Sequence, residues 1–270
     1  ICRCKKNDRG NSKDFIMEYL KKVLYLIFPP IITKLFKSSS YQYKSKFDTY
    51  SKAKEASSIY YDKNSTKKFL GPDDVEVSGR FNIIPLLALS LKKKNIKILD
   101  YGGGANPVYS YIENATNIKT KTYVIEQENF CNVIKRKIPN KFKKYIKYES
   151  SIKKLNQKYF DIICFNSSLQ YLENYESLVS RLIKFNPIYI LITRTNFHMG
   201  KKNYYVLESG IKGSLHPYIF FSFHKLVKFM SSKRYNLVFS NKYNVHRYKH
   251  KTIDNRSFFH KDLLFKKKID

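Results

Sequence analysis

From residue 96 onward, short apolar runs alternate with segments of helical spacing. The apolar runs lie at residues 96–101, 122–126, 145–148, 159–165 and 188–193. The helical segments lie near residues 107–114, 129–138, 174–185 and 223–232. This alternation predicts an α/β fold with a mostly parallel sheet and helices on both of its faces. Two further apolar runs, 235–240 and 258–265, are joined by polar residues, so we expect an antiparallel last pair.

The N-terminal third has a different pattern. Its most apolar stretch contains Pro29 and Pro30 and is too short for a bilayer-spanning helix. Polar residues at three- and four-residue spacing predict an amphipathic helix over 14–28. That helix either packs on the domain core or lies on a membrane, with residues 14–36 against anionic head groups.

The change of pattern divides the chain into two parts. We expect an N-terminal helical extension over residues 1–91, with a helical cap over 48–91 that includes a buried helix at 81–91. Residues 92–270 are expected to form the Rossmann-like α/β domain.

Charge and cysteine content indicate which kinds of binding partner and which cellular compartment to expect. The 270 residues carry a net charge of +31, but only nine of the 52 basic residues are Arg. Because nucleic-acid recognition favours the planar fork of Arg, this balance argues against RNA, although the charge attracts phosphates, anionic lipid and acidic glycans. Four Cys are too few for a disulfide framework, and Cys2 and Cys4 form only a CxC pair without further zinc-like spacing. We therefore expect a cytoplasmic protein without a bound metal, with peripheral contact at the inner membrane face as an option.

Three of the nine glycines follow the first apolar run directly, at Gly102, Gly103 and Gly104. Glycine lets the backbone turn sharply and lets a ligand approach it, at the carboxyl end of a strand where open α/β sheets bind ligands. Asn106 is expected to cap a helix that has Pro107 at its first position. Twenty-two residues after Gly104, Glu126 ends the second strand, where its carboxylate can accept hydrogen bonds from ribose hydroxyls.

This pattern fits a dinucleotide or S-adenosylmethionine. Pro107 stands where the dinucleotide fingerprint needs glycine for helix packing beside a pyrophosphate. A methyl donor has no pyrophosphate, and its amino-acid end needs backbone groups from a glycine turn and the nearby carboxylate of Asp100. The spacing therefore favours methyl transfer.

The chain resembles the class I S-adenosylmethionine-dependent methyltransferases. It is more closely similar to a family of bacterial methyltransferases with an LDFGGG-type motif, often encoded among surface-polysaccharide genes. The matching segments are LDYGGG at 99–104, VIEQ at 124–127, FD at 160–161, NSSLQYL at 166–172 and ITRT at 192–195. The likeness covers roughly residues 25–267. One departure is Asn106, where the family pattern usually has glycine.

The resemblance implies S-adenosylmethionine as the cofactor and a set of site residues. Cofactor-binding candidates are Asp100, Gly102, Gly103, Gly104, Asn106, Glu126, Glu149, Ser150 and Asn166. Gln170, Tyr171 and Arg194 are candidates for acceptor contacts. Methyl transfer from a sulfonium is an in-line displacement that relies on positioning.

A hydroxyl acceptor benefits from a base, for which His216 ranks before His198, with Tyr171 as a further catalytic candidate. Both histidines lie in the long segment 195–221, which we expect to cover the active site. The family context implies O-methylation of a glycan or glycolipid precursor. The alternatives are an RNA methyltransferase, a protein that keeps the cofactor pocket without chemistry, and a membrane-surface binding protein.

Overall fold

The structure is a computed structural model. It describes residues 43–57, 83–209, 214–243 and 258–268, which belong to one compact unit, Tyr41–Asp270. The predicted amphipathic helix 14–28, the membrane contact of residues 14–36 and the CxC pair lie outside the described residues. Within the described ranges, no helix has the length and apolar character needed to cross a membrane.

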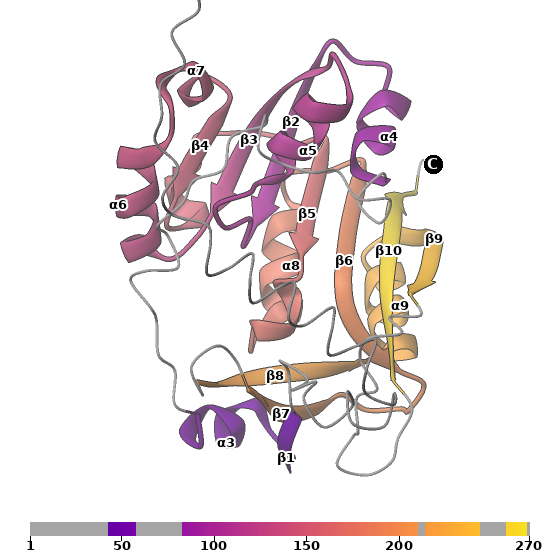
Figure 1. The fold of residues 1–270 in the computed structure, drawn as a ribbon. Helices are drawn as coiled ribbons and strands as arrows, with labels where there is room; N and C mark the ends of the chain where they lie inside the picture. The colour runs from indigo at the N-terminus through magenta and orange to yellow at the C-terminus, as the bar shows by residue number, and fades with distance from the viewer. Residues whose placement is uncertain (1–42, 58–82, 210–213, 244–257, 269–270) are drawn as a thin grey trace, which may run out of the picture. The chain divides into compact units, whose positions relative to one another are not determined.

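The central sheet confirms the predicted α/β architecture (Figure 1). Its parallel strands run in the order β4-β3-β2-β5-β6. Their bounds are β2 (Asn95–Tyr101), β3 (Lys119–Ile125), β4 (Ile146–Glu149), β5 (Ile162–Asn166) and β6 (Tyr189–His198). Next to β6 lies β10 (Phe259–Lys267), antiparallel both to β6 and to β9 (Tyr235–Tyr243), so the predicted antiparallel last pair is also confirmed.

Helices cover both faces of this sheet because successive side chains of each strand point to opposite sides. On β2, Ile96 and Ile98 pack with helices α4 (Ile83–Ser90) and α5 (Val108–Ala115). Leu99 packs in the cluster that contains helices α8 (Tyr175–Ile183) and α9 (Phe223–Ser232). Helices α6 (Glu128–Lys137) and α7 (Asn140–Lys143) pack with β3 and β4. Both faces are therefore buried, which explains why the strands appear as continuous apolar runs.

A second, antiparallel group of strands lies beyond the carboxyl ends of β2 and β5 (Figure 1). It consists of β1 (Tyr43–Phe47), β7 (Tyr204–Ser209) and β8 (Leu215–Ser222). Two residue pairs join β8 to the end of β6. Segment 195–221, the predicted cover of the active site, thus continues β6 and forms β7 and most of β8 in its described part. Short helix α3 (Tyr50–Glu55) follows β1.

Candidate functional site

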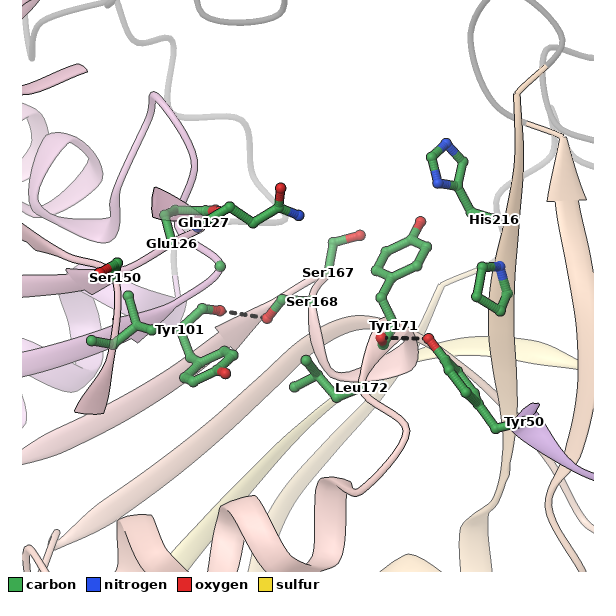
Figure 2. A pocket seen from close by; sticks show the side chains of 13 residues that line it. Tyr50, Tyr101, Glu126, Gln127, Ser150, Ser167, Ser168, Tyr171, Leu172 and His216 are labelled. Carbon is green, nitrogen blue, oxygen red and sulfur yellow. Dashed lines mark hydrogen bonds between the residues drawn. The ribbon is translucent and has the colours of Figure 1, made fainter. Parts of the chain in front are cut away.

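A cavity of about 500 Å³ lies between the carboxyl ends of the parallel strands and the second group of strands (Figure 2). One end is bordered by the glycine turn and by the ends of β3 and β4, and the other end by α3, β8 and the 3-10 helix η5 (Leu169–Tyr171). Ser167 and Ser168, which follow β5, line the part between them. The cavity therefore lies where open α/β sheets bind ligands.

The glycine turn is held by close packing. Gly102 has a φ of +73°, and its N–H donates to the carbonyl of Ile125 at 2.9 Å. A Cβ on Gly103 would overlap the carboxylate of Asp100, so a side chain does not fit there without movement. Gly104 also has a positive φ, of +60°, but no atom lies within 4 Å of where its Cβ would stand. The turn is thus closed toward β2 and open at Gly104.

Asp100 is fully buried beneath this turn and does not border the cavity. Its Oδ2 accepts a hydrogen bond from the N–H of Val108 at 2.8 Å, at the beginning of α5. The pKa of Asp100 is raised to about 7, mainly by burial and to a smaller extent by nearby Glu126, while the bond from Val108 opposes the shift.

The predicted helix cap at Asn106 is wrong. The N-cap residue of α5 is Pro107, and no side chain of that residue or of Asn106 caps the helix. The carboxylate of Asp100 reaches the first helical N–H instead, because β2 ends directly beneath the helix. Oδ1 of Asn106 is buried in the turn without a hydrogen-bond partner.

Glu126 lies at the cavity wall beside the glycine turn. Its Oε1 accepts from the N–H of Gly104 at 3.0 Å and its Oε2 from the N–H of Gln127 at 3.2 Å. Burial raises the pKa of Glu126, and the two backbone bonds oppose that shift. Each carboxylate oxygen has a second lone pair, so Glu126 can hold the turn and still accept bonds from a ligand.

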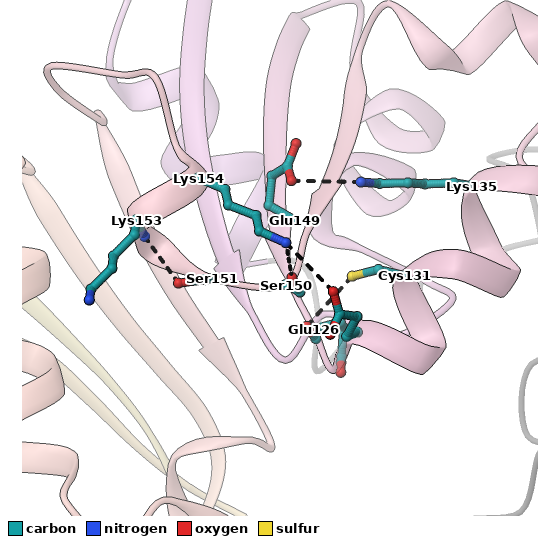
Figure 3. Close-up of polar contacts among 9 residues, drawn as sticks. Glu126, Cys131, Lys135, Glu149, Ser150, Ser151, Lys153 and Lys154 are labelled. Carbon is teal, nitrogen blue, oxygen red and sulfur yellow. Dashed lines mark hydrogen bonds and ion pairs between the residues drawn. The ribbon is translucent and has the colours of Figure 1, made fainter.

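Of the two candidates at the carboxyl end of β4, Glu149 does not border the cavity and Ser150 does. Its hydroxyl accepts from Nζ of Lys154 at 2.9 Å (Figure 3). The carboxylate of Glu149 lies 3.6 Å from Nζ of Lys135 instead. The main-chain carbonyl of Glu149 accepts from the N–H of Glu126 at 3.1 Å and so fixes the position of the neighbouring strand end.

Two predicted site residues, Asn166 at the end of β5 and Gln170 in η5, lie behind the cavity wall and hold it in place. Asn166 accepts a hydrogen bond from a hydroxyl on β6 at 2.9 Å and does not border the cavity. Gln170 is 1% exposed and binds Ser167 Oγ at 3.1 Å and Thr195 Oγ1 at 3.2 Å. Both amides therefore join η5 and β5 to β6, whereas the serines between them face the cavity.

Arg194 and His198, two further candidates, do not border the cavity. Arg194 has a φ of 54°, lies at an irregularity in the β6–β10 pairing, and donates its N–H to Asp262 Oδ1 at 2.9 Å. His198 is 3% exposed, and its Nδ1 accepts from the N–H of Gly200 at 3.0 Å. The strand predicted to end at residue 193 continues to His198. Arg194, expected directly after that strand, and His198, expected in the covering segment, therefore both lie on β6.

Tyr171 and His216 both line the other end of the cavity (Figure 2). The carbonyl of Tyr171 accepts from the hydroxyl of Tyr50 at 2.7 Å, which joins η5 to α3. Nε2 of His216 lies 3.0 Å from Oγ of Ser214. Partial burial lowers the pKa of His216, so its imidazole favours the neutral form.

Sequence reasoning missed Glu208 on β7. Its side chain is 6% exposed, and its Oε2 accepts from the hydroxyl of Tyr171 at 2.5 Å. A second, longer bond of 3.4 Å comes from the hydroxyl of Tyr43 to Oε1. Burial raises the pKa of Glu208, and both tyrosines oppose that shift. The only local signal is an acidic residue at the end of the apolar run 204–207.

Comparisons with known proteins identify the fold. No protein-family model and no curated protein matches the chain. Among solved structures it is similar to the magnesium protoporphyrin IX methyltransferase of Synechocystis PCC 6803 crystallised with S-adenosylmethionine, with a TM-score of 0.50 and 9% identity over 78% of this chain and all of that one. A methyltransferase from Aquifex aeolicus gives a TM-score of 0.46 at 14% identity, covering 76% of this chain and 98% of that chain. The chain therefore has the Rossmann-like fold of S-adenosylmethionine-dependent methyltransferases.

Proposed function

We propose that this protein is an S-adenosylmethionine-dependent methyltransferase that methylates a hydroxyl of a glycan or glycolipid precursor. One observation carries the proposal: a single cavity joins the glycine turn and Glu126 to a second end that holds Tyr171 and His216. The first end suits a nucleoside and the second suits an acceptor. The glycan class is supported by the resemblance to the LDFGGG-type family.

The residues at the first end fit the proposed donor. Gly104 leaves open space beside the turn, and Glu126 offers carboxylate oxygens to ribose hydroxyls. Ser150 offers a hydroxyl at the end of the neighbouring strand, where the adenine edge would lie. The cavity volume of about 500 Å³ lies within the roughly 300–1,000 Å³ that small-molecule sites occupy.

The residues of the chain would contribute to methyl transfer mainly by orienting the donor and the acceptor. Bound S-adenosylmethionine supplies an electrophilic methyl group on a sulfonium sulfur. Glu126 and the glycine turn would hold the ribose end, and Ser167 and Tyr171 line the cavity between that end and the acceptor end. Placing two reactants in line lowers the barrier because the entropy of bringing them together is lost at binding.

The second end of the cavity has side chains suited to a hydroxylated acceptor. The rings of Tyr50 and Tyr171 give flat apolar surfaces, and Pro217 adds a further apolar ring to the lining. Ser167 and His216 add groups that donate and accept hydrogen bonds. Apolar walls with a few placed polar groups are typical of sites that fix the orientation of a small molecule.

Titration calorimetry with S-adenosylhomocysteine tests the donor site. We expect the wild type to bind and Glu126→Ala to bind about tenfold more weakly or worse, because hydrogen bonds to a charged group contribute roughly 1.5–3 kcal/mol. Glu128→Ala is the matched control, since Glu128 is 71% exposed and lies 3.7 Å from Lys154. Failure of the wild type to bind at millimolar ligand would overturn the proposed function.

Transfer of a tritiated methyl group to fractionated cell extract tests the acceptor. We expect the label in glycan or lipid-linked glycan fractions. Label in RNA fractions would overturn the acceptor class while leaving the methyltransferase activity in place. Heat-treated protein serves as the control for spontaneous methylation.

A further inference from the structure

A carboxylate and an imidazole share one face of the second group of strands. In the antiparallel pairing, Glu208 stands opposite His216 on β8 and opposite Tyr43 on β1. Residues directly opposite each other in antiparallel strands lie on the same face, with Cβ atoms about 4.5–5.5 Å apart. The three side chains therefore form a row across the strands, and this row begins at the cavity with His216.

Glu208 is held by phenols from two different elements. Tyr171 on η5 donates to Oε2 at 2.5 Å, and Tyr43 on β1 donates to Oε1 at 3.4 Å. Nδ2 of Asn196 donates to the hydroxyls of both Tyr43 and Tyr218, each at 2.8 Å. This network fixes the position of a carboxylate that is only 6% exposed.

Tyr171 connects this buried carboxylate to the cavity. Its side chain borders the cavity and is 37% exposed, whereas Glu208 itself does not border it. Figure 2 shows the ring of Tyr171 between Ser167 and His216. Its edge-on packing against the ring of Tyr218, with centroids 5.3 Å apart, fixes the direction of the hydroxyl.

We propose that Tyr171 and Glu208 form a proton relay for the acceptor hydroxyl, an inference that rests on the proposed methyltransferase function. Tyr171 is the catalytic residue because it borders the space of the acceptor. Glu208 acts through Tyr171 and is a positioning residue that also receives the proton. No feature of the sequence motifs assigns this role to Glu208.

The proton balance of the relay is simple. As the acceptor oxygen forms its new O–C bond, the C–S bond of the donor breaks and its electron pair stays on sulfur. The hydroxyl proton of the acceptor passes to the phenol oxygen of Tyr171, and the phenol proton passes to Glu208. Glu208 ends as a neutral acid and later releases the proton to water. General-base assistance of this kind contributes roughly 10²–10⁴-fold in rate.

Burial suits Glu208 to this step. It raises the pKa of the carboxyl above its ordinary value, so the neutral acid formed in the relay is less costly. The titratable groups that face Glu208 are Tyr43 from β1, Tyr171 from η5, and His216 and Tyr218 from β8. The bonds from Tyr43 and Tyr171 lower the pKa again, because both phenols donate to the ionised carboxylate.

Carbon-13 NMR of labelled glutamate carboxyls tests the cluster without an acceptor. We expect a resonance, identified by its loss in Glu208→Gln, with a titration midpoint above 4.5. Tyr43→Phe removes a bond that lowers the pKa, so the midpoint rises further. Tyr159→Phe, an identical change at a tyrosine that is 47% exposed, leaves it unchanged. A midpoint at or below 4.5 would overturn the proposal.

Binding and transfer assays then separate the relay from the proposed function. Glu208→Gln and Tyr171→Phe should bind S-adenosylhomocysteine within about twofold of wild type, yet methylate the wild-type acceptor fraction about 100-fold more slowly. The acid limb of the pH profile should disappear in Glu208→Gln and move to higher pH in Tyr43→Phe. Glu55→Gln, at an exposed position, is the matched control.

The two possible failures differ. If both variants keep the wild-type rate and pH profile, the relay is wrong while the methyltransferase function stands. If the wild type neither binds S-adenosylhomocysteine nor transfers methyl groups, the proposed function falls and the relay with it.

Discussion

Oδ2 of Asp100 accepts a hydrogen bond from the N–H of Val108 across 2.8 Å, so a carboxylate on β2 caps helix α5 from below. Asp100 is fully buried, and its Oδ1 has no hydrogen-bond partner. The cap thus anchors the helix that follows the glycine turn, and burial raises the pKa of Asp100 to about 7. Asp100 therefore titrates while it holds the helix that follows the glycine turn, so we expect the stability of this region to depend on pH.

Asp100→Asn should flatten the pH dependence of stability. Folded Asp100 keeps its proton up to about pH 7, whereas its ordinary pKa is 3.8. The folded chain binds more protons between these values, so the free energy of unfolding falls as pH rises through this window. Asn still accepts from Val108 but does not titrate. In wild type, the free energy of unfolding falls between about pH 5 and about pH 7.5. We expect this fall to be smaller in Asp100→Asn, by on the order of 2 kcal/mol, when both proteins are unfolded in urea. Equal pH dependence in both proteins would contradict the buried, protonated Asp100.

Gly103→Ala should destabilise the protein through Asp100. The added Cβ would overlap the carboxylate of Asp100, and overpacking of this kind costs about 1–3 kcal/mol. In the double variant Asp100→Ala with Gly103→Ala, the overlap is gone. The double variant should therefore lose less stability than the sum of the two single variants, by on the order of 1 kcal/mol. Urea unfolding measures all three variants, and strict additivity would show that the two residues do not touch.

The sequence predicts the strands and main helices of the central sheet to within a few residues, except that β6 continues to His198 instead of ending at residue 193. Buried parallel strands must be apolar on both faces, so each appears as a short continuous apolar run. The glycine turn and Glu126 are also found locally, because the turn and the strand end are each defined by neighbouring residues. The antiparallel pairing of β9 with β10 follows from the lack of helical spacing between them.

The second group of strands is not predicted. β8 contains Pro217, which is unusual inside a strand, and β1 lies far from β7 in the sequence. The pairing of β1, β7 and β8 is therefore determined by contacts between distant parts of the chain and not by a local sequence pattern. The contact of Tyr171 with Glu208 spans 37 residues, and the cap of α5 by Asp100 replaces the local cap expected at Asn106. Such long-range contacts leave no periodic signal in one sequence.

Tyr50→Phe should loosen the second end of the cavity. The hydroxyl of Tyr50 donates to the carbonyl of Tyr171 at 2.7 Å, and Ser51 next to it binds Glu173 at 2.9 Å. Removing the first bond should cost about 1 kcal/mol in urea unfolding, because a typical intramolecular hydrogen bond contributes about that much. Tyr159→Phe is the matched control at an exposed ring. Equal stability of both variants would mean that the bond does not anchor η5.

His216 should titrate below the ordinary histidine value of 6.5. Partial burial disfavours the imidazolium, so the folded chain binds this proton more weakly than the unfolded chain. The contribution of His216 to stability is therefore present above pH 6.5 and is lost as pH falls below it. NMR of the imidazole, assigned with His216→Gln, should give a midpoint below 6.5 that returns to 6.5 in concentrated urea. A midpoint above 6.5 in the folded chain would indicate a charged imidazole beside Glu208, and the neutral hydrogen-bonding role at the acceptor end would then be wrong.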